Sequence, residues 1–306
     1  MNVLVTGVTG YVGSRLAPRL VRAGHDVRGL TRGRRTTDLP IELVTGDAVT
    51  GRGLDEALAG IDVAYYLIHS MEHALGANGA FPVRELAAAE NFARAVQAAG
   101  VRRVIYLGGL VPADRQPSTH LASRLAVEET LLSATPCSVA FRASIVIGAG
   151  SRSFRFLVRL VERLPVLAVP AWKDNRTRPV DERDMIEFLA RAASADGVCG
   201  ESLDIGGPDT VTYAELIDRI RHHMLVGRPT IGLRRLTLTP IASRIASLIA
   251  GEDHELIGPL MEGLTTDLLP RDERASQLLG GRMHSLNSAI EHALREWEAH
   301  EPLTAR

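Results

Sequence analysis

The first sixteen residues constrain the fold of this chain more than any other stretch. Residues 3–5 form an apolar run that is long enough for a buried parallel strand and too short for a helix. Three glycines with a G-x-x-G-x-x-G spacing follow this run at once, namely Gly7, Gly10 and Gly13. Helical periodicity begins at Val12, so the sequence predicts a strand, a glycine-rich turn and a helix in direct succession.

Such a turn is suited to bind a nucleotide. It places free backbone N–H groups and the positive end of a helix dipole at one spot, where an anion is stabilised. Glycine is needed because a side chain there would keep a pyrophosphate away from the backbone. A glycine-rich turn without a ligand is the alternative, but the strands and helices that alternate after it favour nucleotide binding. We expect the pyrophosphate to contact the turn and the start of the helix: Gly7, Thr9, Gly10, Tyr11, Val12 and Gly13.

The residues after the second predicted strand, 27–30, indicate which nucleotide binds. In dinucleotide-binding folds this position faces the adenosine ribose, where an acidic residue binds the 2′-hydroxyl and an arginine suits a 2′-phosphate. Here Arg32 and Arg34 follow the strand, and no acidic residue occurs between the end of the strand and Asp38. A solvated basic loop is the alternative, but the chemistry of the position favours NADP(H) over NAD(H).

Strands and helices alternate through about residue 150. The later predicted strands are 41–44, 63–68, 104–107 and 139–147, and the later predicted helices are 54–58, 83–99 and 121–133. This alternation predicts an α/β fold with a Rossmann-type, doubly wound parallel sheet. Ligands of such sheets lie outside the carboxyl ends of the strands, so we expect one crevice formed by these ends. Its expected members beyond the glycine-rich turn are Leu67, Ile68, His69, Ser70, Gly108 and the segment 144–148.

The pattern loosens after residue 150, where a second region begins. We expect residues 1–150 to form the NADP(H)-binding domain, with later segments at about 176–205 returning to it, and residues 151–306 to form mainly a smaller, mostly helical substrate lobe. Two helix starts are marked within this region. Asp181 can cap one helix, and Thr212 with Glu215 has the spacing of a capping box.

Composition narrows the class of protein. The chain has 306 residues and a formal net charge of −1, so nothing indicates binding to nucleic acid or to an anionic membrane surface. Its two cysteines, Cys137 and Cys199, match no metal spacing, and we expect reduced core residues rather than a disulfide. The apolar stretch 236–250 is interrupted by Pro240 and Arg244 and is not expected to span a bilayer. Together with the early first strand, which leaves no room for a signal peptide, this predicts a cytoplasmic protein.

The remaining polar clusters have simple interpretations. Arginines recur along the predicted helix 154–164, and we expect a solvated helix face that could also contact an acidic substrate: Arg152, Arg155 and Arg159. Four histidines lack ligand spacing with acids or cysteines, so we expect no metal: His222, His223, His254 and His284.

The stretch 6–13 resembles the T-G-x-T-G-x-x-G loop of the short-chain dehydrogenase/reductase superfamily, in its extended and atypical branches. Within that superfamily, four further segments are similar to an atypical group of NAD(P)-binding proteins, loosely labelled nucleoside-diphosphate-sugar epimerases and related to the NmrA-like set: 65–71, 107–110, 120–124 and 148–154. The resemblance covers roughly residues 1–225. It implies that Asp47 lies near the adenine amine. It also implies a nicotinamide cofactor, and a homodimer through the helices after the fourth and fifth strands is usual for such relatives.

The chain departs from the superfamily at the catalytic positions. Catalytic members use a tyrosine as general acid and a lysine four residues later, and these positions look like His120 and Arg124 here. The sequence contains no Tyr-x-x-x-Lys, and its single lysine, Lys173, lies far downstream. In one interpretation His120 donates the proton and Arg124 holds the ribose or the oxyanion, with His69 and Ser70 as a second donor. In the other, His120 only begins a helix and Arg124 pairs with a glutamate four residues on, Glu128.

We therefore expect an NADPH-dependent oxidoreductase that transfers hydride to a carbonyl or activated double bond of a small organic substrate. The leucines and isoleucines within 231–269 favour a fairly apolar substrate. A non-catalytic NADP(H)-binding redox sensor or assembly factor is the alternative, because the tyrosine and lysine are missing. A sugar-nucleotide epimerase or dehydratase comes third, because that chemistry also relies on the absent tyrosine. Neither nucleic acid nor membrane is expected as a partner.

Overall fold

The structure is a computed structural model of the whole chain. It describes residues 1–33, 39–68, 81–112, 119–163, 167–169, 171–227, 230–232, 266–301 and 303. Within this part of the chain, no helix is long and apolar enough to cross a membrane.

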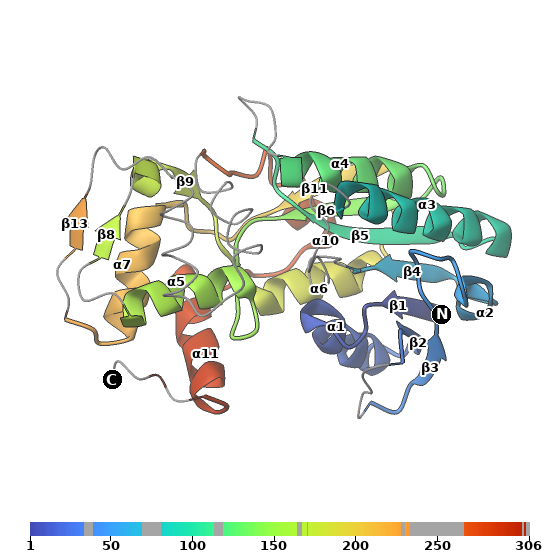
Figure 1. Cartoon of the computed structure of the whole chain (residues 1–306), viewed down its shortest axis with the longest axis horizontal. Helices are drawn as coiled ribbons and strands as arrows, with labels where there is room; N and C mark the ends of the chain where they lie inside the picture. The colour runs from blue at the N-terminus through green and yellow to red at the C-terminus, as the bar shows by residue number, and fades with distance from the viewer. Residues whose placement is uncertain are drawn as a thin grey trace.

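The centre of the molecule is a seven-stranded parallel sheet with the strand order β11-β6-β5-β4-β1-β2-β3 (Figure 1). Its strands are β1 (Asn2–Thr6), β2 (Asp26–Thr31), β3 (Glu42–Thr45), β4 (Val63–Tyr66), β5 (Arg103–Gly109), β6 (Val139–Ala143) and β11 (Glu201–Ile205). The helices that flank it are α1 (Tyr11–Arg22), α2 (Leu54–Leu58), α3 (Phe81–Ala99), α4 (Thr119–Leu132), α6 (Glu182–Ala192) and α10 (Arg274–Leu279). The prediction of a Rossmann-type, doubly wound sheet is confirmed.

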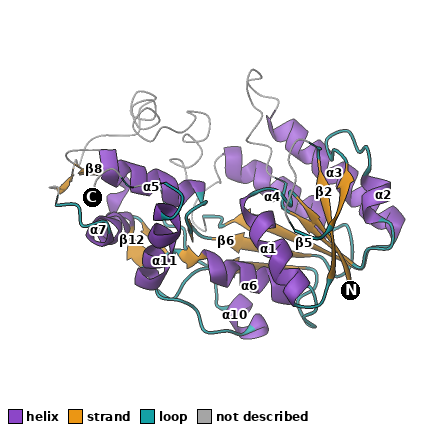
Figure 2. Cartoon of the chain, turned by 90° about the horizontal axis from the view of Figure 1, so that it is seen from below, coloured by secondary structure: helices purple, strands orange, loops and turns teal. Residues whose placement is uncertain are grey.

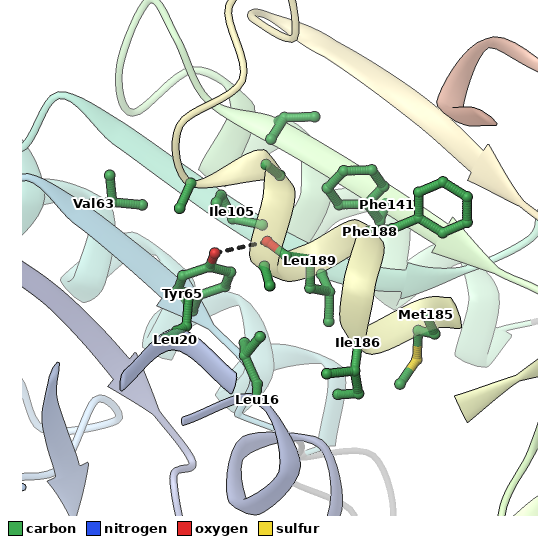
Figure 3. Packing of buried hydrophobic residues seen from close by; sticks show 14 of the residues in the cluster. Leu16, Leu20, Val63, Tyr65, Ile105, Phe141, Met185, Ile186, Phe188 and Leu189 are labelled. Atoms are coloured by element: carbon green, nitrogen blue, oxygen red, sulfur yellow. Dashed lines mark hydrogen bonds between the residues drawn. The ribbon is translucent and has the colours of Figure 1, made fainter. Parts of the chain in front are cut away.

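Helices cover both faces of this sheet because successive strand residues point to opposite sides. In β4, Tyr65 packs in the cluster with α1 and α6, whereas Tyr66 packs in the cluster with α2, α3 and α4. Figure 3 shows the first of these clusters, in which the buried Tyr65 lies among side chains of α1 and α6. The Tyr65 hydroxyl donates a 2.7 Å hydrogen bond to the carbonyl oxygen of Leu189 in α6. The sheet is therefore buried on both sides, and its ligand-binding edge lies at the strand ends.

The strand order places a topological switch point between β1 and β4. The chain moves outward from β1 to β2 and β3, and then crosses to β4 on the other side of β1. At this point the backbone N–H of Leu67 donates to the hydroxyl oxygen of Thr6 over 2.9 Å, which joins the ends of the two strands. Open sheets of this type bind ligands where the strand order reverses. The glycine-rich turn follows β1 at this edge.

A second hydrophobic cluster lies to one side of the sheet and contains three helices, α5 (Arg152–Arg163), α7 (Tyr213–His223) and α11 (Leu286–Glu298). Figure 2 shows α11 beside α5 and α7, and Figure 1 shows α1 and α6 together on the face of the sheet opposite α3 and α4. Short strand pairs accompany these helices: β7 (Val146–Ile147) with β10 (Val180–Asp181), β8 (Leu167–Val169) with β13 (Thr230–Gly232), and β9 (Arg176–Thr177) with β12 (Val211–Thr212). A 3-10 helix spans Ala171–Asp174. Two elements of this half of the chain return to the large sheet: α6 packs on α1, and β11 pairs with β6.

Both predicted helix caps are confirmed. Asp181 is the N-cap of α6 and accepts a hydrogen bond from the backbone N–H of Arg183. Thr212 and Glu215 form a reciprocal capping box at the start of α7.

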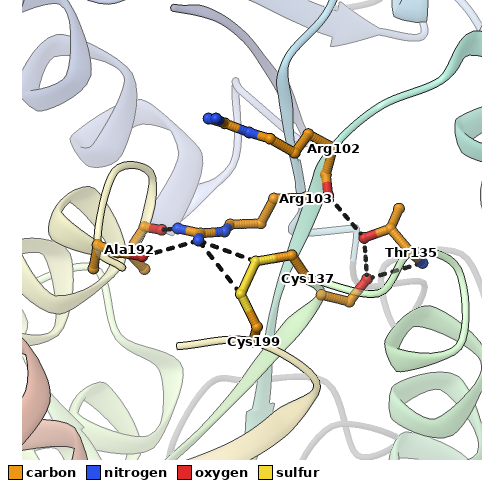
Figure 4. Close-up of a disulfide and its surroundings, with 8 residues drawn as sticks. Arg102, Arg103, Thr135, Cys137, Ala192 and Cys199 are labelled. Atoms are coloured by element: carbon orange, nitrogen blue, oxygen red, sulfur yellow. Dashed lines mark hydrogen bonds between the residues drawn. A yellow bond between two sulfur atoms is a disulfide. The ribbon is translucent and has the colours of Figure 1, made fainter. Parts of the chain in front are cut away.

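The expectation of two reduced cysteines is wrong: Cys137 and Cys199 form a disulfide (Figure 4). The cause is the pairing of β11 with β6 in parallel register, which brings together the residues that precede the two strands. The guanidinium of Arg103 lies over the bond, with Nη2 3.1 Å from the Cys137 sulfur and 3.7 Å from the Cys199 sulfur. Arg103 also donates to backbone carbonyls at the end of α6 and just after it.

The expectation of a solvated arginine face on α5 is wrong for Arg159, which is 7% exposed. Its guanidinium lies 5.0 Å from the ring of Trp297 in α11, and that of Arg155 lies 4.3 Å from it. Ion pairs with Glu162 and Glu301 neutralise Arg159. Arg155 and Arg159 therefore cover a tryptophan from a helix distant in the sequence, and only Arg152 and Arg155 stay partly exposed.

Candidate cofactor and active site

Two glycines of the glycine-rich turn leave no room for a side chain. Gly7 has a φ of +61°, and a β-carbon there would lie 2.9 Å from the carbonyl oxygen of Leu67. A β-carbon at Gly13 would lie 2.7 Å from the Cα of Val8. Because both obstacles are backbone atoms, a side chain at either position would push α1 away from β1 and β4. The spacing of the glycines is thus required by the close approach of strand and helix.

The start of α1 fits a pyrophosphate. Gly10 is the N-cap and donates to the carbonyl oxygen of Gly7 over 2.9 Å, and the first hydrogen bond along the helix runs from the N–H of Ser14 to the carbonyl of Gly10. Gly10 supplies no capping side chain. The N–H groups of residues 11–13 are therefore left at the positive end of the helix dipole, as an anion-binding turn requires. The predicted turn residues Thr9, Tyr11 and Val12 are all partly exposed at this end.

Other predicted crevice residues gather around this turn. Leu67 and Ile68 follow β4 and are half-buried, and the Leu67 backbone contacts the turn at Gly7. Gly108 is buried near the end of β5. The segment 144–148 comes close to the turn at Gly148, where an added β-carbon would collide with the hydroxyl oxygen of Tyr11. His69 and Ser70 lie outside the described residues.

The adenosine end of the expected site contains one exposed arginine and one ordered carboxylate. Arg32 follows β2 and is exposed, and Arg34 lies outside the described residues. Asp47 follows β3, and its Oδ1 accepts the N–H of Val49 over 2.8 Å. Asn91 of α3 donates to two carbonyls of the same loop, at 3.0 Å and 2.8 Å, and so fixes its path. The structure thus places Asp47 in a rigid loop beside the end of β2.

At the other end of the expected site, His120 and Arg124 lie one turn apart in α4. The side chain of His120 lies outside the described part of the structure. The guanidinium of Arg124 is 14% exposed and lies 3.7 Å from the carboxylate of Glu85 in α3. It also lies 5.7 Å from the ring of Tyr106 and donates to the carbonyl of Leu107 over 3.4 Å. Arg124 is therefore held at the end of β5.

The expected pairing of Arg124 with Glu128 is wrong. Glu128 instead binds Arg142 of β6 through both carboxylate oxygens, at distances of 2.7–3.0 Å. Glu128 faces the sheet and is buried, so a strand residue reaches it more readily than a neighbour on the same helix.

Tyr106 does not take the place of the missing catalytic tyrosine. Burial raises its pKa to about 12. Its hydroxyl lies 3.4 Å from the backbone carbonyl of Arg124, toward which it donates. The group stays neutral at physiological pH and is directed at the backbone of α4.

Sequence reasoning missed a polar network beside the glycine-rich turn, in which Glu182 is buried and its partners are partly exposed. The Tyr11 hydroxyl donates a hydrogen bond to Oε2 of Glu182, the first residue of α6. The same oxygen lies 3.0 Å from Nε of Arg15, and Nη2 of Arg15 lies 2.6 Å from Glu296 of α11. His292 of α11 completes the group, since its ring and the two carboxylates offer ligand atoms within 4.8 Å of one another. Arg15 supplies the positive charge that the two carboxylates need.

The chain is similar to known proteins over most of its length. A family model described as the NAD dependent epimerase/dehydratase family matches residues 3–164. A ceramide reductase of Caulobacter vibrioides is 31% identical over 277 residues, which cover 88% of this chain and 86% of the relative. The chain belongs to the NAD-dependent epimerase/dehydratase family.

A second relative is similar in sequence, and solved structures share the fold. A 2-alkyl-3-oxoalkanoate reductase of Stenotrophomonas maltophilia is 24% identical and covers 76% of this chain and 77% of its own length. The crystal structure of gox2253 has a TM-score of 0.77 at 20% identity and covers 99% of both chains. The UDP-glucuronic acid 4-epimerase from Bacillus cereus, in complex with UDP-glucuronic acid and NAD, has a TM-score of 0.72 at 18% identity, covering 98% of this chain and 99% of its own. Family and relatives support an NAD(P)-dependent oxidoreductase of the extended short-chain dehydrogenase/reductase type.

Proposed function

We propose that this protein is an NADPH-dependent reductase that acts on the carbonyl of a small, largely apolar substrate. The observation that carries the proposal is the start of α1, which has no side-chain cap, lies at the switch point of the sheet and follows a turn whose glycines leave no room for a side chain. A bound dinucleotide would supply the hydride. The chain would supply the binding, the orientation and the proton.

The roles of the individual residues follow from their places along the sheet edge. The N–H groups of residues 11–13 would bind the pyrophosphate, and Asp47 would lie toward the adenine. Arg32, exposed after β2, supports NADPH over NADH because a guanidinium can pair with a 2′-phosphate. At the end of β5, Arg124 would stabilise the developing oxyanion or the ribose, and His120 on the same helix would donate the proton.

The substrate class follows from the relatives. Ceramide reductase and 2-alkyl-3-oxoalkanoate reductase are both named for lipid-like molecules, and the second name specifies an oxo group beside alkyl chains. We therefore place 3-oxo compounds with alkyl chains first among candidate substrates.

The experiment has two steps. NADPH and NADH are titrated into the protein and followed by nicotinamide fluorescence. NADPH consumption is then measured against 3-oxo esters of increasing chain length and against a panel of other carbonyls and enones, with wild type, His120→Ala and Arg124→Gln compared. Turnover that increases with chain length and falls by about 10²-fold or more in His120→Ala supports the proposal. Tight NADPH binding without turnover of any carbonyl or enone refutes the reductase assignment.

One relative is named as a subunit of a larger assembly, which supports an assembly factor as the second candidate. The mitochondrial NADH dehydrogenase [ubiquinone] 1 alpha subcomplex subunit 9 of Arabidopsis thaliana is 26% identical over 225 residues, which cover 56% of its own length. The absence of a Tyr-x-x-x-Lys in this chain agrees with such a role. In that case NADP(H) would order the protein for a partner. The two steps of the experiment separate the candidates, because only the reductase consumes NADPH.

A further inference from the structure

The network beside the glycine-rich turn joins two regions that have separate hydrophobic cores. Tyr11 and Arg15 belong to α1, which packs in the core of the large sheet. Glu296 belongs to α11, whose apolar face packs with α5 and α7 in the second core. Glu182 begins α6 and lies between them. The path from the pyrophosphate turn to the last helix therefore consists of three consecutive polar contacts: Tyr11 to Glu182, Glu182 to Arg15, and Arg15 to Glu296.

Neighbouring groups hold the partly exposed side chain of Tyr11 in place. Its ring lies against the backbone of Gly150, where a β-carbon would come within 2.6 Å of a ring carbon, and under the guanidinium of Arg15 at 4.4 Å. Burial and the neighbouring Glu182 raise the pKa of the Tyr11 hydroxyl far above its usual value, so the group stays protonated and acts as a donor. Burial also raises the pKa of Glu182, while Tyr11 and Arg15 oppose this effect. Glu182 is 5% exposed, and a buried carboxylate of this kind depends on its two partners.

Tyr11 is also the first residue of α1, so its backbone N–H belongs to the anion-binding end of the helix. A contact that fixes its side chain limits the orientations of the first helical turn, and with them the direction in which these N–H groups point. Preorganised donors bind an anion more tightly than mobile ones, because less order is lost on binding.

We propose that Glu182 and Arg15 are positioning residues of the dinucleotide site, and that they couple the C-terminal helix α11 to the pyrophosphate turn. When α11 is docked, its Glu296 positions the guanidinium of Arg15. Arg15 and Glu182 then position the side chain of Tyr11, which fixes the first turn of α1. By linkage, a dinucleotide bound at the turn stabilises the docked position of α11 to the same extent that docked α11 strengthens dinucleotide binding. This inference rests on dinucleotide binding at the glycine-rich turn and is independent of the reaction catalysed.

The test compares Tyr11→Phe, Glu182→Gln, Glu296→Gln and the Tyr11→Phe/Glu296→Gln double variant with wild type. Glu291→Gln is the matched control, because Glu291 is a solvent-exposed residue of α11 that pairs only within its own helix in the described contacts. Each protein is measured for NADPH affinity by fluorescence, for thermal unfolding, and for amide hydrogen exchange of residues 7–13 and 286–298 with and without NADP⁺.

We expect Tyr11→Phe and Glu296→Gln each to weaken NADPH binding by about three- to tenfold, as the loss of one hydrogen bond or ion pair predicts. The double variant should lose less than the product of the two factors, because both changes interrupt one path. NADP⁺ should slow exchange in residues 286–298 of wild type and of Glu291→Gln, and slow it less in Glu296→Gln. Without cofactor, exchange in residues 7–13 should be faster in Tyr11→Phe, Glu182→Gln and Glu296→Gln than in wild type.

Two results would overturn the proposal. One is wild-type NADPH affinity in Glu296→Gln together with unchanged exchange of the turn. The other is a loss of affinity that only follows a general fall in unfolding temperature, which would indicate a structural role. If wild type binds no dinucleotide, the cofactor assignment fails, and exchange of residues 7–13 without cofactor still decides whether α11 and the turn are coupled.

Discussion

Removal of the Cys137–Cys199 disulfide should lower the stability of the protein by a calculable amount. The bond joins residues 62 positions apart, at the starts of β6 and of the edge strand β11. A cross-link over a loop of this length reduces the entropy of the unfolded chain and stabilises the fold by about 4 kcal/mol. An unfolding entropy of about 2.1 cal/mol/K per residue, applied to 306 residues, converts this into a fall of about 6–7 °C in Tm.

The perturbation is the double substitution Cys137→Ser and Cys199→Ser, compared with wild type in the presence and absence of a dithiol reductant. Tm is followed by circular dichroism, and free thiols are counted in parallel. The carbonyls of Ala192 and Ala195, to which Arg103 donates, are untouched by the substitutions, so the variant removes the cross-link and the two sulfur contacts of Arg103 but leaves its backbone partners in place.

Wild type without reductant should have no free thiols and the higher Tm, and reduction should bring it to the Tm of the double variant. The reductant should not change the Tm of the variant. Two free thiols in untreated wild type, or a fully reduced wild type with an unchanged Tm, would refute the reasoning.

Three further predictions concern buried and charged groups of the sheet region. Tyr65→Phe leaves the buried carbonyl of Leu189 without its 2.7 Å partner and should lower the free energy of unfolding by about 1–3 kcal/mol in a urea titration. Asp181→Ala removes the side-chain cap of α6 and should cost about 1–2 kcal/mol in the same assay, whereas Asp181→Asn should cost less. Hydrogen bonds from Arg19 lower the pKa of Glu187 below its ordinary value, so this carboxylate stabilises the fold above that ordinary value and the benefit is lost as the pH falls through the lowered pKa. The difference in unfolding free energy between wild type and Glu187→Gln should therefore be present at neutral pH and disappear in acid; a difference that grows in acid would contradict the assignment.

Local patterns in the sequence predicted the sheet and the start of the site. The strand, the glycine-rich turn and the first helix depend on neighbouring residues, and the short helix 54–58 was predicted with the bounds that the structure has. The caps at Asp181 and Thr212 also involve residues only two or three positions apart. Such features need no knowledge of the tertiary fold.

Contacts between distant residues could not be predicted in this way. Tyr11 and Glu182 are 171 positions apart, and nothing in the sequence near either residue indicates the other. The disulfide became possible only because β11 lies beside β6. The sequence predicted an exposed Arg159 because arginine side chains are usually exposed. In the structure, a tryptophan from α11 and two glutamates accommodate its buried guanidinium. In each case the partner comes from an element that the sheet topology or the second core brings close.

The central claim is that the turn after β1 binds the pyrophosphate of a nicotinamide dinucleotide. The most direct measurement is the NADPH affinity of wild type, Gly13→Ala and Gly227→Ala by fluorescence titration, each checked for folding by circular dichroism. A β-carbon at Gly13 would meet the backbone of the turn, whereas one at Gly227 would meet nothing within 4 Å. We predict that wild type and Gly227→Ala bind NADPH equally and that Gly13→Ala loses binding; wild type that binds neither NADPH nor NADH, or Gly13→Ala with undiminished affinity, would contradict the account.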